Sequence, residues 1–273
     1  MQASVAIVPV RRVAECTEML TVSRLSIAPV RGLRLHHPNQ VRLGYHGVPD
    51  DRRFLLLDTD DRIFDGTRLG TLVQVRADLR HDPEHLALTF PDGTIVADEV
   101  ALDAPMQVTV YKREFAVRPV IGPWADALSA YAERDLQLVR VERLDEAMDR
   151  HPVSIVSTAS VEELGRHVEP PGPVDARRFR MLVEVAGARP HEEDEWLGDD
   201  LRIGEAVITV TKLDARCVIT TQHPDTGLRD ISTLHVIRAY RGLRDGRHLD
   251  FGVYAEVRTP GTIRVGDAVT PGG

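Results

Sequence analysis

Apolar and polar residues alternate along much of the chain, and this period of two predicts short β-strands. The run from Leu86 to Val96 alternates on both sides of Asp92-Gly93, a pattern that is typical of a two-stranded hairpin. Residues 108–111 and 115–117 look like a second pair of strands. The first half of the chain is therefore expected to be a small barrel or sandwich of antiparallel strands.

Helical spacing replaces this alternation in a few places. Apolar residues recur at intervals of three or four from Trp124 to Tyr131, directly after Gly122-Pro123, and proline is favoured in the first turn of a helix. This predicts a helix near residues 123–133. A short helix is expected to open at Ser160 with a capping box, and another to span Ser232 to Tyr240. The fold class is therefore α+β and mostly β.

The composition excludes several classes of protein. The chain has 273 residues and a formal net charge of -8, so a general nucleic-acid surface, which needs a basic footprint, is not expected. No run of about 18 apolar residues occurs, so no membrane-spanning helix is expected. Residues 1–19 lack the basic start of a secretory signal and are expected to be a loose extension, which together with only two cysteines favours the reducing cytoplasm.

The segment around Cys217 contains the strongest candidate chemistry. A thiolate is a soft metal ligand and a nucleophile, and the neighbouring Arg216 favours its charged form. Residues 218–221 have strand character and residues 223–227 are turn-forming, so the thiol is expected at the start of a strand that runs into a tight turn. Cys217 is thus a candidate metal ligand, and the alternative is a small buried hydrophobic residue.

Three segments resemble the MOSC family, which is named for the C-terminal domain of molybdenum cofactor sulfurase and includes the mitochondrial amidoxime-reducing component and bacterial relatives. They are Ala-Arg-Cys-Val-Ile-Thr-Thr at 215–221, Pro-Asp-Thr-Gly at 224–227 and Thr-Ile-Arg-Val-Gly-Asp at 262–267. The resemblance implies a molybdenum pyranopterin (molybdopterin) cofactor, with Cys217 as the metal ligand and catalytic residue. It also implies an N-terminal β-barrel-like domain at residues 20–145 and a β-rich MOSC domain with a few short helices at residues 146–271.

The same resemblance implies cofactor-binding residues in the first half of the chain. Ala-Pro-Val-Arg-Gly at 28–32 is similar to the family's Tyr-Pro-Val-Lys-Ser motif, so Arg31 and Gly32 are expected at the pterin, with glycine in place of a hydroxyl donor. Arg52 corresponds to the arginine of an Asp-Arg-aromatic motif. Without the resemblance, Arg31 reads as a solvated surface arginine, and Arg52 as the partner of Asp51 in a surface ion pair.

Further expected cofactor contacts lie in the second half. Asp149 and His151 match a family Asp-x-small-Pro loop, although a lone loop histidine is often incidental. Arg180 aligns with the cofactor-contacting arginine of an Arg-Phe-Arg-Pro-Asn motif, and Arg216 lies beside the thiol. Here Met181 and Leu182 replace the proline and asparagine, which removes amide donors and an acceptor from the site. The acidic run at residues 192–195 is expected to be a solvated loop.

The resemblance implies an enzyme that reduces a small N-hydroxylated substrate, such as an amidoxime or hydroxylamine. The sequence has no Gly-x-Gly-x-x-Gly motif, P-loop, His-Glu-x-x-His motif or cysteine cluster. Electrons are therefore expected from a separate protein of the flavin, ferredoxin or cytochrome type. One alternative is a MOSC-fold protein without molybdenum that acts as a sulfur carrier or tailoring enzyme through Cys217. Another is a cofactor carrier without catalysis.

Overall fold

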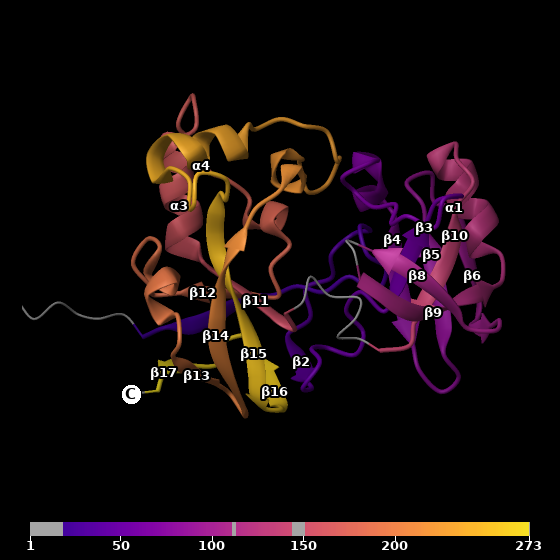
Figure 1. The fold of residues 1–273 in the computed structure, drawn as a ribbon, viewed down its shortest axis with the longest axis horizontal. Coiled ribbons are helices and arrows are strands. Elements are labelled where there is room, and N and C mark those ends of the chain that lie inside the picture. The colour runs from indigo at the N-terminus through magenta and orange to yellow at the C-terminus, as the bar shows by residue number, and fades with distance from the viewer. Residues whose placement is uncertain (1–18, 111–112, 144–150, 273) are drawn as a thin grey trace, which may run out of the picture.

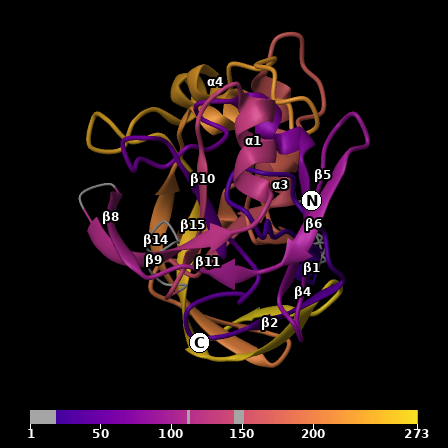
Figure 2. The same ribbon diagram turned by 90° about the vertical axis from the view of Figure 1, so that its right-hand side faces the viewer.

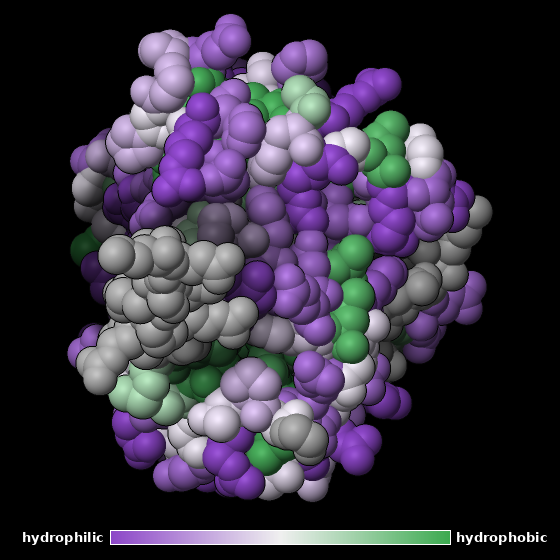
Figure 3. Space-filling view, turned by 90° about the vertical axis from the view of Figure 1, so that its left-hand side faces the viewer, coloured by the Kyte–Doolittle hydropathy of each residue, from purple (hydrophilic) through white to green (hydrophobic). Residues whose placement is uncertain are grey.

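The computed structural model describes residues 19–110, 113–143 and 151–272 as two lobes that lie side by side (Figure 1). Strands dominate both lobes and the helices are few and short, which confirms the predicted mostly β, α+β fold class. The described helices are all too short or too polar to cross a lipid bilayer. The face of the molecule at the left of Figure 1 is mainly hydrophilic, with hydrophobic side chains in small groups (Figure 3).

The C-terminal lobe is built on a seven-stranded sheet. Its strands are, in spatial order, β1 (Thr21–Leu25), β12 (Val183–Ala186), β11 (Val153–Ser157), β15 (Asp250–Thr259), β14 (Ala206–Ala215), β13 (Asp200–Ile203) and β17 (Val269–Pro271). The lobe also contains the strand pair β2 (Gln40–Leu43) and β16 (Gly261–Arg264), the helices α3 (Thr158–His167) and α4 (Thr233–Arg241), and the 3-10 turns η2 (Ala176–Phe179), η3 (Glu192–Trp196) and η4 (Val218–Thr221).

Within its described residues, the N-terminal lobe combines a five-stranded and a three-stranded sheet with one α-helix (Figure 2). The larger sheet contains β3 (Phe54–Leu57), β10 (Gln137–Val141), β9 (Arg113–Ile121), β7 (Ala101–Leu102) and β8 (Met106–Val110). The smaller sheet contains β4 (Arg76–Arg80), β5 (His85–Thr89) and β6 (Ile95–Glu99), and the lobe is completed by α1 (Trp124–Ala132) and the 3-10 turn η1 (Gly70–Gln74). The hairpin around Asp92-Gly93 and the helix after Pro123 are thereby confirmed.

The chain passes between the lobes more than once. Strands β1 and β2 come early in the sequence but pair with β12 and β16 of the C-terminal lobe. Between them, Val30 forms a bridge to Phe54 at the start of β3 and lies in the core of the N-terminal lobe. The central strands bury apolar residues on both faces. In β3, Phe54 and Leu56 belong to one cluster and Leu55 and Leu57 to another, and the C-terminal lobe likewise has two clusters, so each lobe has its own core. The predicted division of the chain near residue 145 stays a prediction.

Several local predictions were wrong. Residues 218–221 form the 3-10 turn η4 and not a strand. Helix α3 begins at Thr158, and its cap is Ser157, whose Oγ accepts from the backbone N–H of Ser160. Ser160 therefore lies inside the first turn, where its hydroxyl bonds to Glu193. Glu193 is fully buried, so the acidic run is not a solvated loop. Such non-local partners leave no periodic signal in the sequence.

Candidate functional site

A cavity of about 370 Å³ lies where the two lobes meet. Its walls include residues 31–32, 52 and 65–67 from the N-terminal lobe, and residues 151–154, 179–182, 214–219 and 254 from the C-terminal lobe. Apart from Asp149, which lies outside the described residues, every residue predicted for the site lines this cavity. The fold thus brings together residues that lie far apart in the sequence, from Arg31 to Tyr254.

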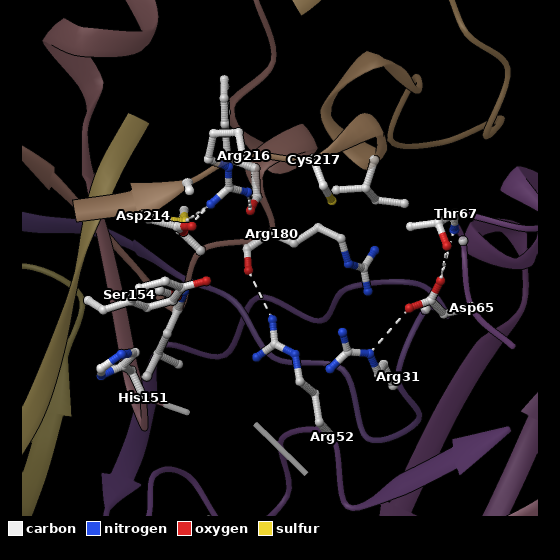
Figure 4. Close-up of a pocket in the computed structure, with 18 of the residues that line it drawn as sticks. Arg31, Arg52, Asp65, Thr67, His151, Ser154, Arg180, Asp214, Arg216 and Cys217 are labelled. Carbon is white, nitrogen blue, oxygen red and sulfur yellow. Dashed lines mark hydrogen bonds and ion pairs between the residues drawn. The ribbon is translucent and has the colours of Figure 1, made fainter. Parts of the chain in front are cut away.

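The thiol of Cys217 is exposed and unpaired. Strand β14 ends at Ala215, and Cys217 is the extended residue that precedes η4. Its carbonyl accepts hydrogen bonds from the backbone N–H of Thr220 at 3.3 Å and from the Thr220 hydroxyl at 3.1 Å. Figure 4 shows the sulfur directed towards the cavity. The exposed position contradicts the alternative of a buried hydrophobic residue, and the bonded backbone holds the thiol in place.

Arg216 braces the segment that carries the thiol. Its guanidinium is paired with the buried carboxylate of Asp214, and it donates to the backbone oxygen of Phe179. The guanidinium carbon lies 5.4 Å from the centre of the Phe179 ring. The Arg216 Nε atom is buried and has no hydrogen-bond partner among the described residues. The charge of Arg216 is therefore largely balanced within the protein, although one donor remains available.

Arg180, in contrast, has an unbalanced charge. It follows η2 in a left-handed conformation with φ 54°, and its Nη2 atom donates to the backbone oxygen of Leu33 at 2.7 Å. No carboxylate among the described residues lies within ion-pair distance of it. Burial, and then the charge of Arg52, lower the pKa of Arg180 to about 10. A partly buried cation without a carboxylate partner is what an anion-binding site requires.

Two arginines of the N-terminal lobe point into the same space (Figure 4). The Nε atom of Arg31 donates to Asp65 at 3.3 Å. Arg52 pairs with the buried Asp51 and donates to the backbone oxygen of Arg180 at 3.2 Å. Neither arginine is the solvated surface residue of the alternative interpretation. Together with Arg180 they form a positive wall below the thiol, in a chain that is acidic as a whole.

Gly32 has a backbone conformation that explains the missing hydroxyl residue. Its φ is +87°, and a Cβ atom at this position would lie 3.0 Å from the backbone nitrogen of Gly66. A serine here would be strained by both the dihedral angle and the close approach. The glycine at position 32 therefore follows from the way residues 65–66 pack against it.

Comparisons with known proteins match the part of the chain that contains Cys217. The MOSC domain family matches residues 142–270. The chain contains a MOSC domain. The chain is 35% identical over 129 residues to mitochondrial amidoxime-reducing component 1 of Mus musculus, and this alignment covers 44% of the chain and 36% of the relative. It is also 26% identical over 241 residues to molybdenum cofactor sulfurase of Caenorhabditis briggsae, which covers 86% of this chain and 33% of that protein.

The chain thus aligns with only about a third of the length of these two relatives. Among solved structures, it is similar to the YuaD protein from Bacillus subtilis, with a TM-score of 0.43 and 12% identity over 92% of this chain and 94% of the other. It is also similar to YiiM from Geobacillus stearothermophilus, with a TM-score of 0.33 and 16% identity over 45% and 55% of the two chains.

The MOSC domain provides Cys217 and Arg180, whereas Arg31 and Arg52 lie outside its matched range. The cavity is therefore complete only when both lobes are present. Among the described residues, no group of three or more histidine, cysteine or acidic residues could hold a metal ion.

Sequence reasoning missed Asp65 and Asp214, the acidic residues that hold Arg31 and Arg216. Asp65 also accepts from the backbone and the hydroxyl of Thr67, at 3.0 and 2.6 Å, which fixes its carboxylate. For Asp214 the only clue was its place two residues before Arg216, at the end of β14. Asp65 is 34 residues away from Arg31, and its role could not be read from a local pattern.

The remaining wall of the cavity is formed by rings and apolar side chains of the MOSC domain. The rings of His151 and Tyr254 stack with their centres 4.8 Å apart, a pairing that no local pattern of residues indicates. Met181 and Leu182, at the positions where the resemblance led us to expect proline and asparagine, line the cavity. The Met181 sulfur accepts from Arg216 at 3.2 Å. This part of the wall is therefore apolar, and it contacts Arg216 through the Met181 sulfur.

Proposed function

We propose that this protein is a molybdenum pyranopterin-dependent oxidoreductase that reduces small N-hydroxylated substrates, such as amidoximes or hydroxylamines. The observation that carries the proposal is the exposed thiol of Cys217, which faces the same cavity as the carboxylate-free Arg180. The MOSC domain and the relatives named for amidoxime reduction and for molybdenum cofactor sulfuration support the cofactor class.

The residues of the cavity fit such a group. Arg180 has no carboxylate partner among the described residues, and the Nε atom of Arg216 has no acceptor there, so an anionic phosphate would satisfy cationic donors that the protein leaves unsatisfied. Arg31 and Arg52 would add charge from the other lobe. Gly32 and Gly66 also line the cavity, and a Cβ atom on Gly66 would lie 2.7 Å from the Cδ1 atom of Ile219. Cys217 would supply a thiolate ligand to the metal.

When bound, the molybdenum centre would supply two-electron redox chemistry. The proposed overall reaction consumes two electrons and two protons, breaks the N–O bond of the substrate and releases water and the reduced nitrogen compound. The electrons would come from a separate donor protein of the flavin, ferredoxin or cytochrome type. Within this chain, the arginines would orient the cofactor, and the stacked rings of His151 and Tyr254 would form a wall beside the substrate.

Protein made in a host that synthesises the cofactor tests the proposal. We expect a molybdenum content near one atom per chain by elemental mass spectrometry, and reduction of benzamidoxime to benzamidine with a chemical electron donor. Molybdenum without turnover would support the cofactor-carrier alternative.

The molybdenum-free alternative is favoured by one observation, the buried apolar pair Met181 and Leu182 in the cavity wall. It predicts no molybdenum, and a persulfide on Cys217 after incubation with a sulfurtransferase that loads sulfur from cysteine. Intact-protein mass spectrometry would detect this persulfide as a gain of one sulfur atom, and a molybdenum content near zero would exclude the reductase.

A further inference from the structure

The loop that follows the thiol in the chain contacts the N-terminal lobe through its backbone. The latch loop, residues 222–228, comes directly after η4. A Cβ atom on Gly70 of the N-terminal lobe would lie 2.0 Å from the backbone oxygen of Gly227 in the latch loop, and one on Gly227 would lie 1.9 Å from the backbone oxygen of Gly70. Because these are backbone atoms, no side-chain rotation could make room. Only two glycines permit this approach.

Gln222 makes the buried contact between the latch loop and the cavity wall. Its side chain is buried, and Nε2 donates to the backbone oxygen of Gly66 at 2.6 Å. Gly66 is the neighbour of Asp65, which holds Arg31. Gln222 is in turn five residues after Cys217. A single side chain therefore connects the segment that carries the thiol to the segment that holds an arginine of the opposite wall.

The rim of the latch loop is tied to both lobes. Gln74 of η1 donates to the backbone oxygen of Thr226 at 2.9 Å. Asp225 lies 3.6 Å from Arg34 of the N-terminal lobe. Its two oxygens also accept from Arg177 of the C-terminal lobe, each at 2.8 Å. Within the loop, the backbone N–H of Gly227 donates to the backbone oxygen of His223 at 2.8 Å, so the loop itself is a closed turn.

We propose that the latch loop positions the thiol: the Gly70–Gly227 contact and the Gln222 hydrogen bond set the separation between Cys217 and the N-terminal arginines. Without these contacts, Cys217 would remain exposed, but Arg31 and Arg52 would move away from it. The inference rests on the proposed function only in assigning the thiol and the arginines to one ligand. Gln222 and the two glycines are positioning residues, because none of them lines the cavity.

A charge-sensitive reagent pair can measure this separation in cofactor-free protein. Iodoacetate and iodoacetamide both alkylate the Cys217 thiolate and release iodide. The exposure and the ionisation of the thiol affect both rates equally, so their effects cancel in the ratio of the two rates. Only iodoacetate carries a negative charge, so the ratio reports how close the arginines lie to the sulfur. Peptide mass spectrometry assigns the alkylation to Cys217 and separates it from Cys16.

Two variants break the latch by independent means. Gly70→Ala forces the backbone of the latch loop away, and Gln222→Met removes the donor while keeping a side chain of similar length. Gly172→Ala is the matched control, because its new Cβ would meet only one atom, at 3.9 Å. We expect the iodoacetate-to-iodoacetamide ratio to fall by about threefold or more in both latch variants and to stay unchanged in the control.

An unchanged iodoacetate-to-iodoacetamide ratio in Gln222→Met would overturn the proposal. If Gly70→Ala does not fold, the Gln222→Met variant alone tests it. A wild-type ratio no higher than that of free cysteine would overturn it as well. The measurement needs no molybdenum. Protein that never binds molybdenum but shows the expected ratios would refute the reductase and support the role of the latch loop. Protein that binds molybdenum and is active, but whose ratio does not change in the Gln222→Met variant, would support the reductase and refute the role of the latch loop.

Discussion

The arginines that line the cavity differ in whether a carboxylate of the protein pairs with them. Arg216 and Arg31 each have an aspartate, at Asp214 and Asp65. Arg180 has only a backbone oxygen, and its pKa is lowered by burial and by Arg52. Because such an arrangement costs stability in the absence of a ligand, we expect Arg180 to contribute to binding and not to folding.

Removing the charge of Arg180 should therefore raise the stability of the cofactor-free protein and weaken cofactor binding. Arg180→Met is expected to raise the free energy of unfolding of cofactor-free protein by about 1 kcal/mol, less than the pKa shift alone implies because the guanidinium is partly exposed. The same variant should lose at least about tenfold in bound molybdenum. Urea titration and elemental analysis measure the two effects. Arg62→Met, at an exposed surface pair, is the control and should change neither. A destabilised Arg180→Met protein would contradict the prediction.

Loss of the thiol should remove the metal and spare the fold. Cys217→Ala is expected to contain almost no molybdenum and to have no activity, because alanine has no atom that could replace the proposed thiolate ligand. Its unfolding free energy should stay within about 0.5 kcal/mol of wild type, since the side chain is exposed. Elemental analysis, turnover of benzamidoxime and a urea titration test these points. Normal activity in this variant would refute the ligand role.

At the level of secondary-structure elements, His191, the residue before η3, contacts α4. Its hydrogen-bond partners determine which ring nitrogen carries the hydrogen. Arg241 of α4 can only donate, and it lies 2.6 Å from Nδ1 of His191, so Nδ1 is the acceptor. The hydrogen is then on Nε2, which donates to the Tyr240 oxygen at 3.1 Å. Burial, followed by the charge of Arg241, lowers the pKa of His191 to about 4. The contact thus requires a neutral ring.

This contact gives a pH dependence with a definite sign. The unfolded chain binds a proton at His191 near its ordinary pKa of 6.5, whereas the folded chain does so only near pH 4, so stability falls as the pH drops through this window. We expect wild type to lose about 1 kcal/mol more than His191→Gln between pH 7 and pH 5, after allowance for solvent screening of a half-buried ring. The difference between the two proteins cancels the opposite contributions of Glu193 and Asp194, whose pKa values are raised by burial. Parallel pH curves would contradict the prediction.

The caps of the helices can be tested in the same way. Ser157→Ala removes the acceptor for the backbone N–H of Ser160 at the buried start of α3. We expect a loss of about 1 to 2 kcal/mol in the free energy of unfolding, measured by urea titration. Thr158→Ala changes a partly buried hydroxyl for which the structure shows no capping bond, so it should cost clearly less and is the control. Equal losses in the two variants would contradict Ser157 as the cap.

The two lobes are expected to unfold together. The chain crosses between them near residues 26–30 and 48–54, and Arg180 and Arg52 bond across the boundary. Each lobe contains one of the two tryptophans, Trp124 in the N-terminal core and Trp196 in the C-terminal core. Protein labelled with 5-fluorotryptophan should give two ¹⁹F signals whose urea midpoints agree within about 0.2 M. Clearly separate midpoints would show independent domains.

The sequence was sufficient for the features that depend on neighbouring residues. Alternation predicted the β-rich class and the hairpin at Asp92-Gly93, and proline with helical spacing predicted α1. The residues that resemble the MOSC family, including Cys217 and Arg180, were found from local motifs, and the structure places them in one cavity. The roles assigned to them and the domain boundary stay predictions.

The tertiary structure alone decided which partners these residues have. Residues 218–221 have strand propensity, but their hydrogen bonds and the docking of the latch loop on Gly70 make them a 3-10 turn. Glu193 is buried because Ser157 and Ser160 satisfy its oxygens. Asp65 faces Arg31 only after the chain has passed between the lobes. Contacts of this kind depend on the distance between segments far apart in the sequence, which no local pattern of residues contains.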